Sequence, residues 1–123
     1  MILVDTSVWV DHLQRGNTTL AALLTRGQVL AHPFVIGELA LGSLKQRDDI
    51  LGAMQALPVA SVATDEEVLL FIATHRLHGI GIGYVDAHLL TATRLTTGTQ
   101  LWTLDKRLQA AATQLRAAYS STH

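Results

Sequence analysis

The chain has 123 residues, of which 49% are hydrophobic, so it can bury a substantial core in one domain and has little room for a second. It contains no cysteine, which excludes disulfides, thiolate zinc sites and cysteine nucleophiles. The formal net charge of −1 does not by itself indicate a nucleic-acid partner. No apolar run approaches the ~20 residues of a transmembrane helix, and a first strand that begins at Ile2 leaves no space for a signal peptide. We therefore expect a cytoplasmic protein.

The amino-terminal half alternates short apolar runs with segments of helical periodicity. The run at 2–4 predicts a buried strand, and a helix is expected over about 7–14. The next elements expected are a helix that Thr18 or Thr19 caps and Gly27 ends, a strand at 29–31, a helix from Pro33 to about 44, and a helix over about 46–56.

The carboxyl-terminal half continues this alternation. A short strand is expected at 57–59, and the capping-box spacing of Thr64 and Glu67 predicts a helix that runs to about 77. The remaining elements expected are a glycine-rich loop at 79–83, a helix over about 84–96, a strand at 101–104, a helix over about 106–115 and a short final strand at 116–119.

Short, continuously apolar strands that alternate with helices are typical of a parallel sheet covered on both faces. We therefore predict an α/β fold, a three-layer α/β/α sandwich with a four- to five-stranded parallel sheet. It forms a single domain over 1–123, with a frayed tail from about 120 to 123. Ligands bind such sheets beyond the carboxyl ends of the strands. Asp5 and Asp105 follow the strands at 2–4 and 101–104, although each could equally cap the helix after it.

Two further acids lie on predicted helices. Asp86 is in a first turn, where the helix dipole favours a carboxylate, but its neighbours are apolar. Glu38 is expected to be partly buried, because the positions three and four residues away hold Phe34, Val35, Leu41 and Gly42. A buried carboxylate is costly unless it is paired or binds a metal, so both acids are candidate ligands.

Four acids without cysteine favour a hard cation, because magnesium and manganese prefer carboxylate and water oxygens. Such a site suits phosphodiester hydrolysis, in which one ion orients and deprotonates a water and a second, ~4 Å away, stabilises the leaving oxygen. Apart from the four acids the chain has 9 basic and 6 acidic residues, so the neutral total charge is compatible with a nuclease.

Four segments of the sequence resemble the acidic motifs of PIN domains, in the same order and at the same spacing. They are Leu3-Val4-Asp5-Thr6-Ser7-Val8-Trp9, Ile36-Gly37-Glu38-Leu39, Gly83-Tyr84-Val85-Asp86-Ala87-His88-Leu89-Leu90 and Leu101-Trp102-Thr103-Leu104-Asp105. The chain is most similar to VapC-type toxins of bacterial type II toxin–antitoxin pairs, and the similarity spans nearly its whole length.

The resemblance implies a metal-dependent endoribonuclease that cleaves RNA with Mg²⁺ or Mn²⁺. It also implies a homodimer and a cognate VapB-like antitoxin whose tail can occupy the active-site groove. Under this resemblance Asp5 and Asp86 are the principal metal ligands, and Glu38 and Asp105 are the remaining two acids. Three hydroxyl residues near the metals are also implied: Thr6, Ser7 and Thr103.

Other signals have simpler explanations. The pair His75 and His78 lies at a helix end and has no evident third metal ligand, and His88 is expected to be structural or exposed. Trp9 and Trp102 lie in apolar runs and are expected in the core rather than stacked on bases. The loop at 79–83 lacks a preceding strand and a Walker lysine, so it is not a phosphate cradle.

Lys106 and Arg107 follow Asp105 directly, and could either reach RNA phosphates or lie on a solvated helix face; Lys45 and Arg47 are weaker candidates for phosphate contact. Two other classes of protein stay open at this point. One is a catalytically silent binding module with the same fold. The other is an aspartyl-phosphate receiver or phosphatase, although Ser7 stands where such a phosphatase needs its second acid.

Overall fold

The computed structural model describes residues 1–120 and contains a central parallel sheet. The sheet has the order β2-β1-β3, with β1 at Ile2–Val4, β2 at Val29–Leu30 and β3 at Gln100–Trp102. β1 is the middle strand and pairs with β2 on one side and with β3 on the other. All three residues of β1 are buried, as its continuous apolar sequence predicts.

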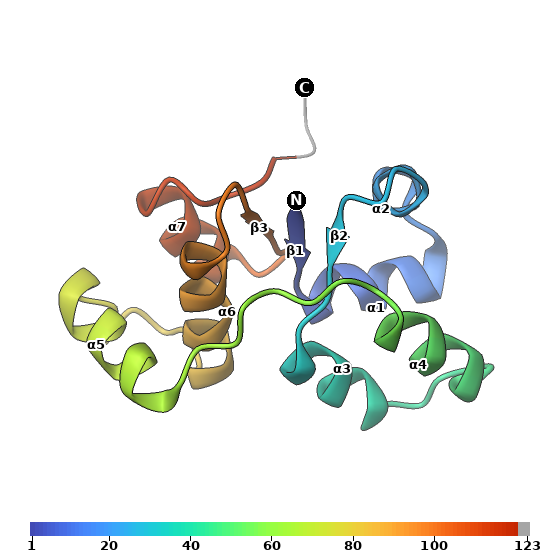
Figure 1. Ribbon diagram of the computed structural model, residues 1–123, viewed down its shortest axis with the longest axis horizontal. Coiled ribbons are helices and arrows are strands. Elements are labelled where there is room, and N and C mark those ends of the chain that lie inside the picture. Colours follow the sequence, from blue (N-terminus) through green and yellow to red (C-terminus); the bar gives the residue numbers. More distant parts are fainter. Residues whose placement is uncertain (121–123) are drawn as a thin grey trace.

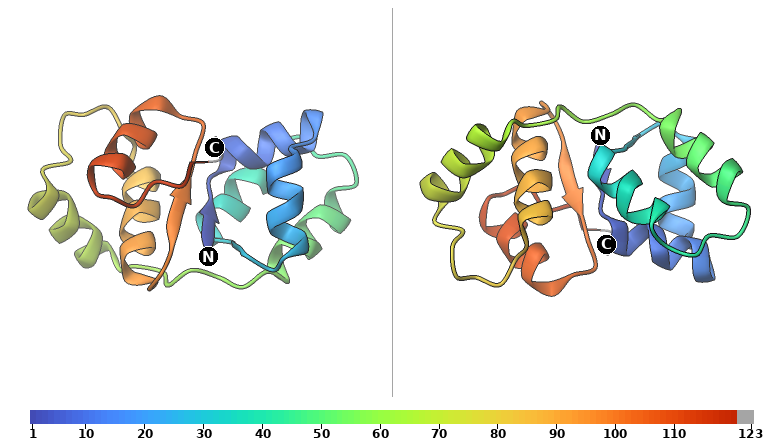
Figure 2. Two further views of the ribbon diagram at one scale, coloured as in Figure 1. Left: turned by 90° about the horizontal axis from the view of Figure 1, so that it is seen from above. Right: turned by 90° about the horizontal axis from the view of Figure 1, so that it is seen from below.

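Seven helices surround the sheet in the described part of the chain. They are α1 (Thr6–Arg15), α2 (Thr18–Thr25), α3 (Pro33–Ala40), α4 (Arg47–Gln55), α5 (Asp65–His75), α6 (Tyr84–Leu95) and α7 (Lys106–Gln114). Helices α1 to α4 lie on one side of the strands and α5 to α7 on the other (Figure 1), and the views from above and below show the same division (Figure 2). The predicted α/β/α arrangement is confirmed.

The number of strands was predicted wrongly. Instead of four or five strands the sheet has three, because the segments expected at 57–59 and 116–119 each form a single bridge, Ala31 to Val59 and Leu101 to Ala118. Pro58 has no backbone N–H and cannot extend the first ladder. Arg116 adopts a left-handed conformation with φ 58°, so the last segment becomes extended only after it.

Local signals explain most helix ends. The capping box of Thr64 and Glu67 is present at the start of α5, and Pro33 occupies the first turn of α3. The cap of α2 is Asn17, whose side chain accepts the Leu20 N–H, rather than the expected Thr18 or Thr19. Helix α3 ends at Ala40, short of the predicted residue 44.

Apolar side chains from the sheet and from helices of both sides form one large core. Trp9 and Trp102 are 5% and 4% exposed, so the prediction that both belong to the core is confirmed. No helix in residues 1–120 is both long and apolar enough to cross a membrane. Of the tail predicted to be frayed, only Ser120 is among the described residues.

Candidate active site

Asp5 lies directly after the carboxyl end of the central strand β1. It is 6% exposed, and its backbone N–H donates to the Trp102 carbonyl at the end of β3. Although Asp5 occupies the N-cap position of α1, its side chain makes no capping hydrogen bond. The alternative that this carboxylate serves as a helix cap is therefore wrong.

Two hydroxyl groups fix the Asp5 carboxylate. Ser7 Oγ and Thr103 Oγ1 donate to Asp5 Oδ2 at 2.8 and 2.7 Å. Each hydroxyl in turn accepts a backbone N–H from the turn after β3: Ser7 from Leu104 at 2.9 Å and Thr103 from Asp105 at 3.0 Å. The end of β1 and the turn after β3 are thus joined through one buried carboxylate.

Asp86 lies in the first turn of α6 and is half-buried. Its Oδ2 accepts the Gly83 N–H at 3.1 Å, so it contributes to the start of the helix. Burial raises the pKa of the Asp86 carboxyl above its ordinary value, and the negative charges of Asp5, Asp105 and Glu38 raise this pKa further. The hydrogen bond from Gly83 lowers the pKa but does not offset these effects. The structure therefore brings the other three predicted acids within electrostatic range of Asp86.

The other two acids are exposed. Glu38 is not partly buried as predicted, because α3 turns Gly37 and Glu38 outward and buries Val35 and Leu39 instead. Glu38 Oε1 accepts a hydrogen bond from Thr6 Oγ1 at 2.7 Å. The capping alternative is correct for Asp105, whose Oδ1 accepts two backbone N–H groups of α7.

No basic side chain pairs with the four acids in the part of the chain that the structure describes. The ion pairs found within residues 1–120, Arg15 with Asp11 and His88 with Asp65, include none of them. Nor, in the same residues, do three carboxylate or imidazole groups already lie close enough to enclose a metal ion. The site is thus an open group of acids rather than a closed metal cage.

These residues fit a hard divalent cation. The acids offer only oxygen ligands. The other three acids repel the negative charge of Asp86, and a bound cation would offset this repulsion. Magnesium retains several of its waters, so it does not need every acid at direct coordination distance. Asp5, Asp86, Glu38 and Asp105 are the residues that could hold such an ion.

Two buried histidines help to hold α3 and α6 in place. His88, predicted to be structural or exposed, is buried and structural, with its Nε2 3.2 Å from Asp65 Oδ1 and its ring against Phe34 and Tyr84. His32 was missed: its Nδ1 accepts the Phe34 N–H and caps α3. Burial, with a smaller effect of His88, lowers the pKa of His32 to about 4. A histidine directly before a proline at a helix start was the available signal.

A groove of about 640 Å³ opens beside Glu38. Thr6 and Glu38 lie along it together with apolar side chains of α1, α3 and α4, and Lys45 lies on its wall. Glu38 is the only one of the four acids among the residues that line this groove.

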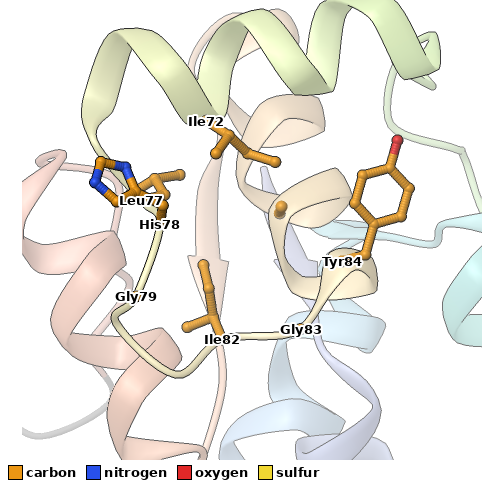
Figure 3. Close-up of a pocket in the computed structure, with 8 residues that line it drawn as sticks. Ile72, Leu77, His78, Gly79, Ile82, Gly83 and Tyr84 are labelled. Atoms are coloured by element: carbon orange, nitrogen blue, oxygen red, sulfur yellow. The ribbon is translucent and has the colours of Figure 1, made fainter.

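A smaller hollow of about 210 Å³ lies between α5 and the loop before α6 (Figure 3). Ile72, Leu77 and Ile82 line it, and none of the four acids does. His78 is at its edge, whereas the His75 ring packs on Phe71 with 4.3 Å between the centroids. The two histidines therefore have separate surroundings, and this hollow is not part of the acidic site.

Comparison with known proteins identifies the family. Residues 2–114 match the model of the PIN domain, which is most of the chain. The chain therefore belongs to the PIN domain family, as the four acidic segments indicated.

Among individual proteins, the chain is 50% identical over 111 residues to Ribonuclease VapC32 of Mycobacterium tuberculosis, in both strain CDC 1551 / Oshkosh and strain ATCC 25618 / H37Rv. The match covers 90% of this chain and 90% of each relative. The crystal structure of FitAcB from Neisseria gonorrhoeae is similar at a TM-score of 0.59 and 21% identity, over 92% of this chain and 94% of that one. This likeness supports the fold.

Proposed function

We propose that this chain is a metal-dependent endoribonuclease and the toxic component of a toxin–antitoxin pair. The observation that carries the proposal is the position of Asp86, a half-buried carboxyl whose pKa is raised by burial and by the charges of Asp5, Asp105 and Glu38. Four converging acids with no basic partner among the described residues are unfavourable by themselves and suit a divalent cation. The 50% identity to a ribonuclease supports RNA as the substrate.

The chain's own residues supply placement and charge. Asp5 is fixed by Ser7 and Thr103, so it would bind Mg²⁺ or Mn²⁺ at a defined point beyond β1. Asp86 would be the second principal ligand, with Glu38 and Asp105 completing the set from the exposed side. When bound, the ion supplies Lewis acidity for activating water and stabilising charge on phosphate oxygens. The groove at Glu38 admits the RNA chain beside these acids.

The two other classes explain the site less well. In an aspartyl-phosphate protein the nucleophilic carboxylate must be open to attack, but Asp5 is 6% exposed and accepts two hydroxyl hydrogen bonds on one oxygen. A catalytically silent binding module has no need of four converging carboxylates. Metal-activated water therefore accounts best for the arrangement.

The decisive test is cleavage of a cellular RNA pool in Mg²⁺ or Mn²⁺. We expect wild type to cut RNA. Asp5→Asn and Asp86→Asn should each cut at least about 1,000-fold more slowly, because each removes a charged ligand while the shape of the side chain is kept. Asp49→Asn, an acid in α4 outside the site, is the matched control and should cut like wild type. Equal cutting by wild type and both site variants, or cutting by wild type in EDTA, would remove the proposal.

The antitoxin is proposed to bind in the groove at Glu38. Val10 is 38% exposed and lines this groove, so Val10→Glu should weaken a complex with the cognate VapB-like protein encoded beside this gene. Leu95→Glu places the same charge on an exposed leucine of α6 and serves as the control. Co-purification of the two proteins measures the effect, and equal loss of the complex in both variants would contradict this location.

A homodimer is proposed to form through α5. Leu69 and Leu70 are adjacent on this helix and are 60% and 69% exposed, which is unfavourable for an unpartnered helix face. We expect a dimer by light scattering and a shift toward monomer in Leu69→Asp. A dimer that survives Leu69→Asp combined with Leu70→Asp would place the interface elsewhere.

A further inference from the structure

Arg107 lies across the backbone of Gly81, in the loop before α6. A Cβ added to Gly81 would meet three Arg107 atoms, at 2.5 Å from NH1, 2.9 Å from Cδ and 3.0 Å from Cζ. Gly81 also has φ +85°, a conformation that favours glycine. The arginine therefore contacts a specific point of this loop and does not project freely from α7.

Neither a direct ion pair nor the dipole of α7 accounts for a cation at this position. Within residues 1–120 the Arg107 side chain makes no ion pair and donates no hydrogen bond; its backbone N–H donates to Asp105 Oδ1. It lies in the first turn of α7, where the helix dipole disfavours a positive charge. The guanidinium donors are consequently available to a ligand.

The contact point is close to the acidic site. Gly81 is two residues before Gly83, whose N–H binds the Asp86 carboxylate, and two residues of chain span at most ~7 Å. On the other side, Arg107 is two residues after Asp105, whose charge reaches Asp86. The arginine thus stands beside the acids without pairing with them.

We propose that Arg107 binds a backbone phosphate of the RNA next to the scissile one, and that Gly81 sets the position of its guanidinium. A guanidinium matches the geometry of a phosphate and can bind it through two N–H groups. A cation is needed there because four carboxylates repel the RNA backbone before a metal ion offsets their charge. This inference rests on the proposed ribonuclease function.

The test is the salt dependence of binding, with an Asp5→Asn parent and a labelled pool of mixed-sequence single-stranded RNA 12-mers in Mg²⁺. Arg107→Ala should lower affinity about three- to tenfold and reduce the slope of log K against log salt by about 0.7, the value of one phosphate contact on a single strand. Lys106→Ala, one residue away in the same first turn, should leave the slope unchanged. An unchanged slope in Arg107→Ala, or an equal change in both variants, overturns the inference.

Two glycines of the same loop provide a second, independent test. Gly81→Ala introduces a methyl where Arg107 lies, whereas Gly79→Ala has the same backbone strain at φ +73° and nothing within 4 Å of the new Cβ. We expect Gly81→Ala to lower the slope of log K against log salt as Arg107→Ala does, although Arg107 is retained. Gly79→Ala should keep the slope of the parent. Combining Gly81→Ala with Arg107→Ala should add nothing further. Equal behaviour of both glycine variants contradicts the role of Gly81.

Failure of this inference is distinguishable from failure of the proposed function. If wild type does not cut RNA at all, the ribonuclease proposal fails first. If wild type cuts but the Arg107→Ala binding slope matches its parent, only the phosphate contact fails. In cutting assays Arg107→Ala should raise KM more than it lowers kcat, because a flanking phosphate is bound equally in the ground and transition states.

Discussion

Asp5 and Glu38 belong to the same group of acids but are positioned in different ways. Asp5 is buried at the end of the central strand, and two hydroxyls that are themselves fixed by backbone N–H groups donate to it. Glu38 is on the exposed side of α3 and accepts one hydrogen bond, from Thr6. The site therefore has a fixed side at the sheet and an open side at the groove.

This difference assigns separate tasks to the two sides. A buried carboxylate with two donors cannot move without leaving polar groups unpaired, so under the proposed function Asp5 would define where an ion binds. An exposed carboxylate can follow an ion or a substrate at little cost, so Glu38 can adjust as RNA enters the groove. Variants of each side can test this division.

The largest effect is expected when both donors to Asp5 are removed. Ser7→Ala combined with Thr103→Val leaves a buried carboxylate and two backbone N–H groups without partners. We expect the free energy of unfolding to fall by about 2–4 kcal/mol and RNA cutting to fall at least about 100-fold. Denaturant unfolding and a cutting assay measure both, and a double variant as stable and active as wild type would show that Asp5 is not fixed in this way.

Low pH should destabilise the protein through His32, at the start of the helix that carries Glu38. His32 caps α3, which carries Glu38, and its pKa of about 4 is below the ordinary 6.5. The unfolded chain therefore binds a proton at higher pH than the folded chain, and stability is lost as pH falls from 6.5 toward 4, by roughly 3 kcal/mol at most. His32→Asn keeps an acceptor for the Phe34 N–H and cannot take up the proton, so its stability should depend less steeply on pH. Parallel curves for the two proteins would contradict this assignment.

A gain in stability is expected when the repulsion among the acids is reduced. The raised pKa of Asp86 means that the unfolded chain loses this proton first, so stability falls as pH rises above the ordinary value of 3.8 and through the folded value. Asp86→Asn retains an oxygen for the Gly83 N–H and removes the charge. In EDTA at pH 7 we expect it to be more stable by on the order of 1 kcal/mol, or about 3–5 °C in Tm.

Two controls accompany that measurement. The gain should disappear as pH falls below the ordinary value of 3.8, where Asp86 holds its proton in both the folded and the unfolded chain. It should shrink or reverse in Mn²⁺, which stabilises only a protein with an intact set of acids. A gain of equal size at every pH would mean that Asp86→Asn acts through packing rather than charge.

The sequence predicted most of the elements and the family well because both follow from local patterns. A continuous apolar run before Asp5 indicates a buried parallel strand, and the position after such a strand is where ligands bind. The core positions of Trp9 and Trp102 followed from the same runs. These features depend on neighbours in the chain, which a sequence shows directly.

The errors concern properties that depend on distant segments. Glu38 was expected to be partly buried from its apolar neighbours, but its exposure is decided by which side of α3 meets the core. The bridges of Val59 and Ala118 were predicted as strands because apolar runs do not show how far a ladder continues. The contact of Arg107 with Gly81 joins residues 26 positions apart, and no spacing rule indicates it.

The smallest effect is expected from one substitution made on each side of the site. Thr6→Val and Thr103→Val each replace a hydroxyl by a methyl group and keep the shape of the side chain. Thr6 donates to the exposed Glu38, whereas Thr103 donates to the buried Asp5. Water can replace the lost partner of Glu38, so Thr6→Val should change the free energy of unfolding by less than about 0.5 kcal/mol. It should raise the Mn²⁺ concentration for half-maximal cutting about two- to fivefold, because Glu38 then samples more orientations, and saturating Mn²⁺ should restore the rate. Thr103→Val should cut RNA more slowly than wild type at every Mn²⁺ concentration, since excess ion cannot reposition a buried carboxylate.

If saturating Mn²⁺ restores the cutting rate of both variants equally, the two sides do not differ in rigidity, and the assignment of separate tasks to Asp5 and Glu38 is wrong.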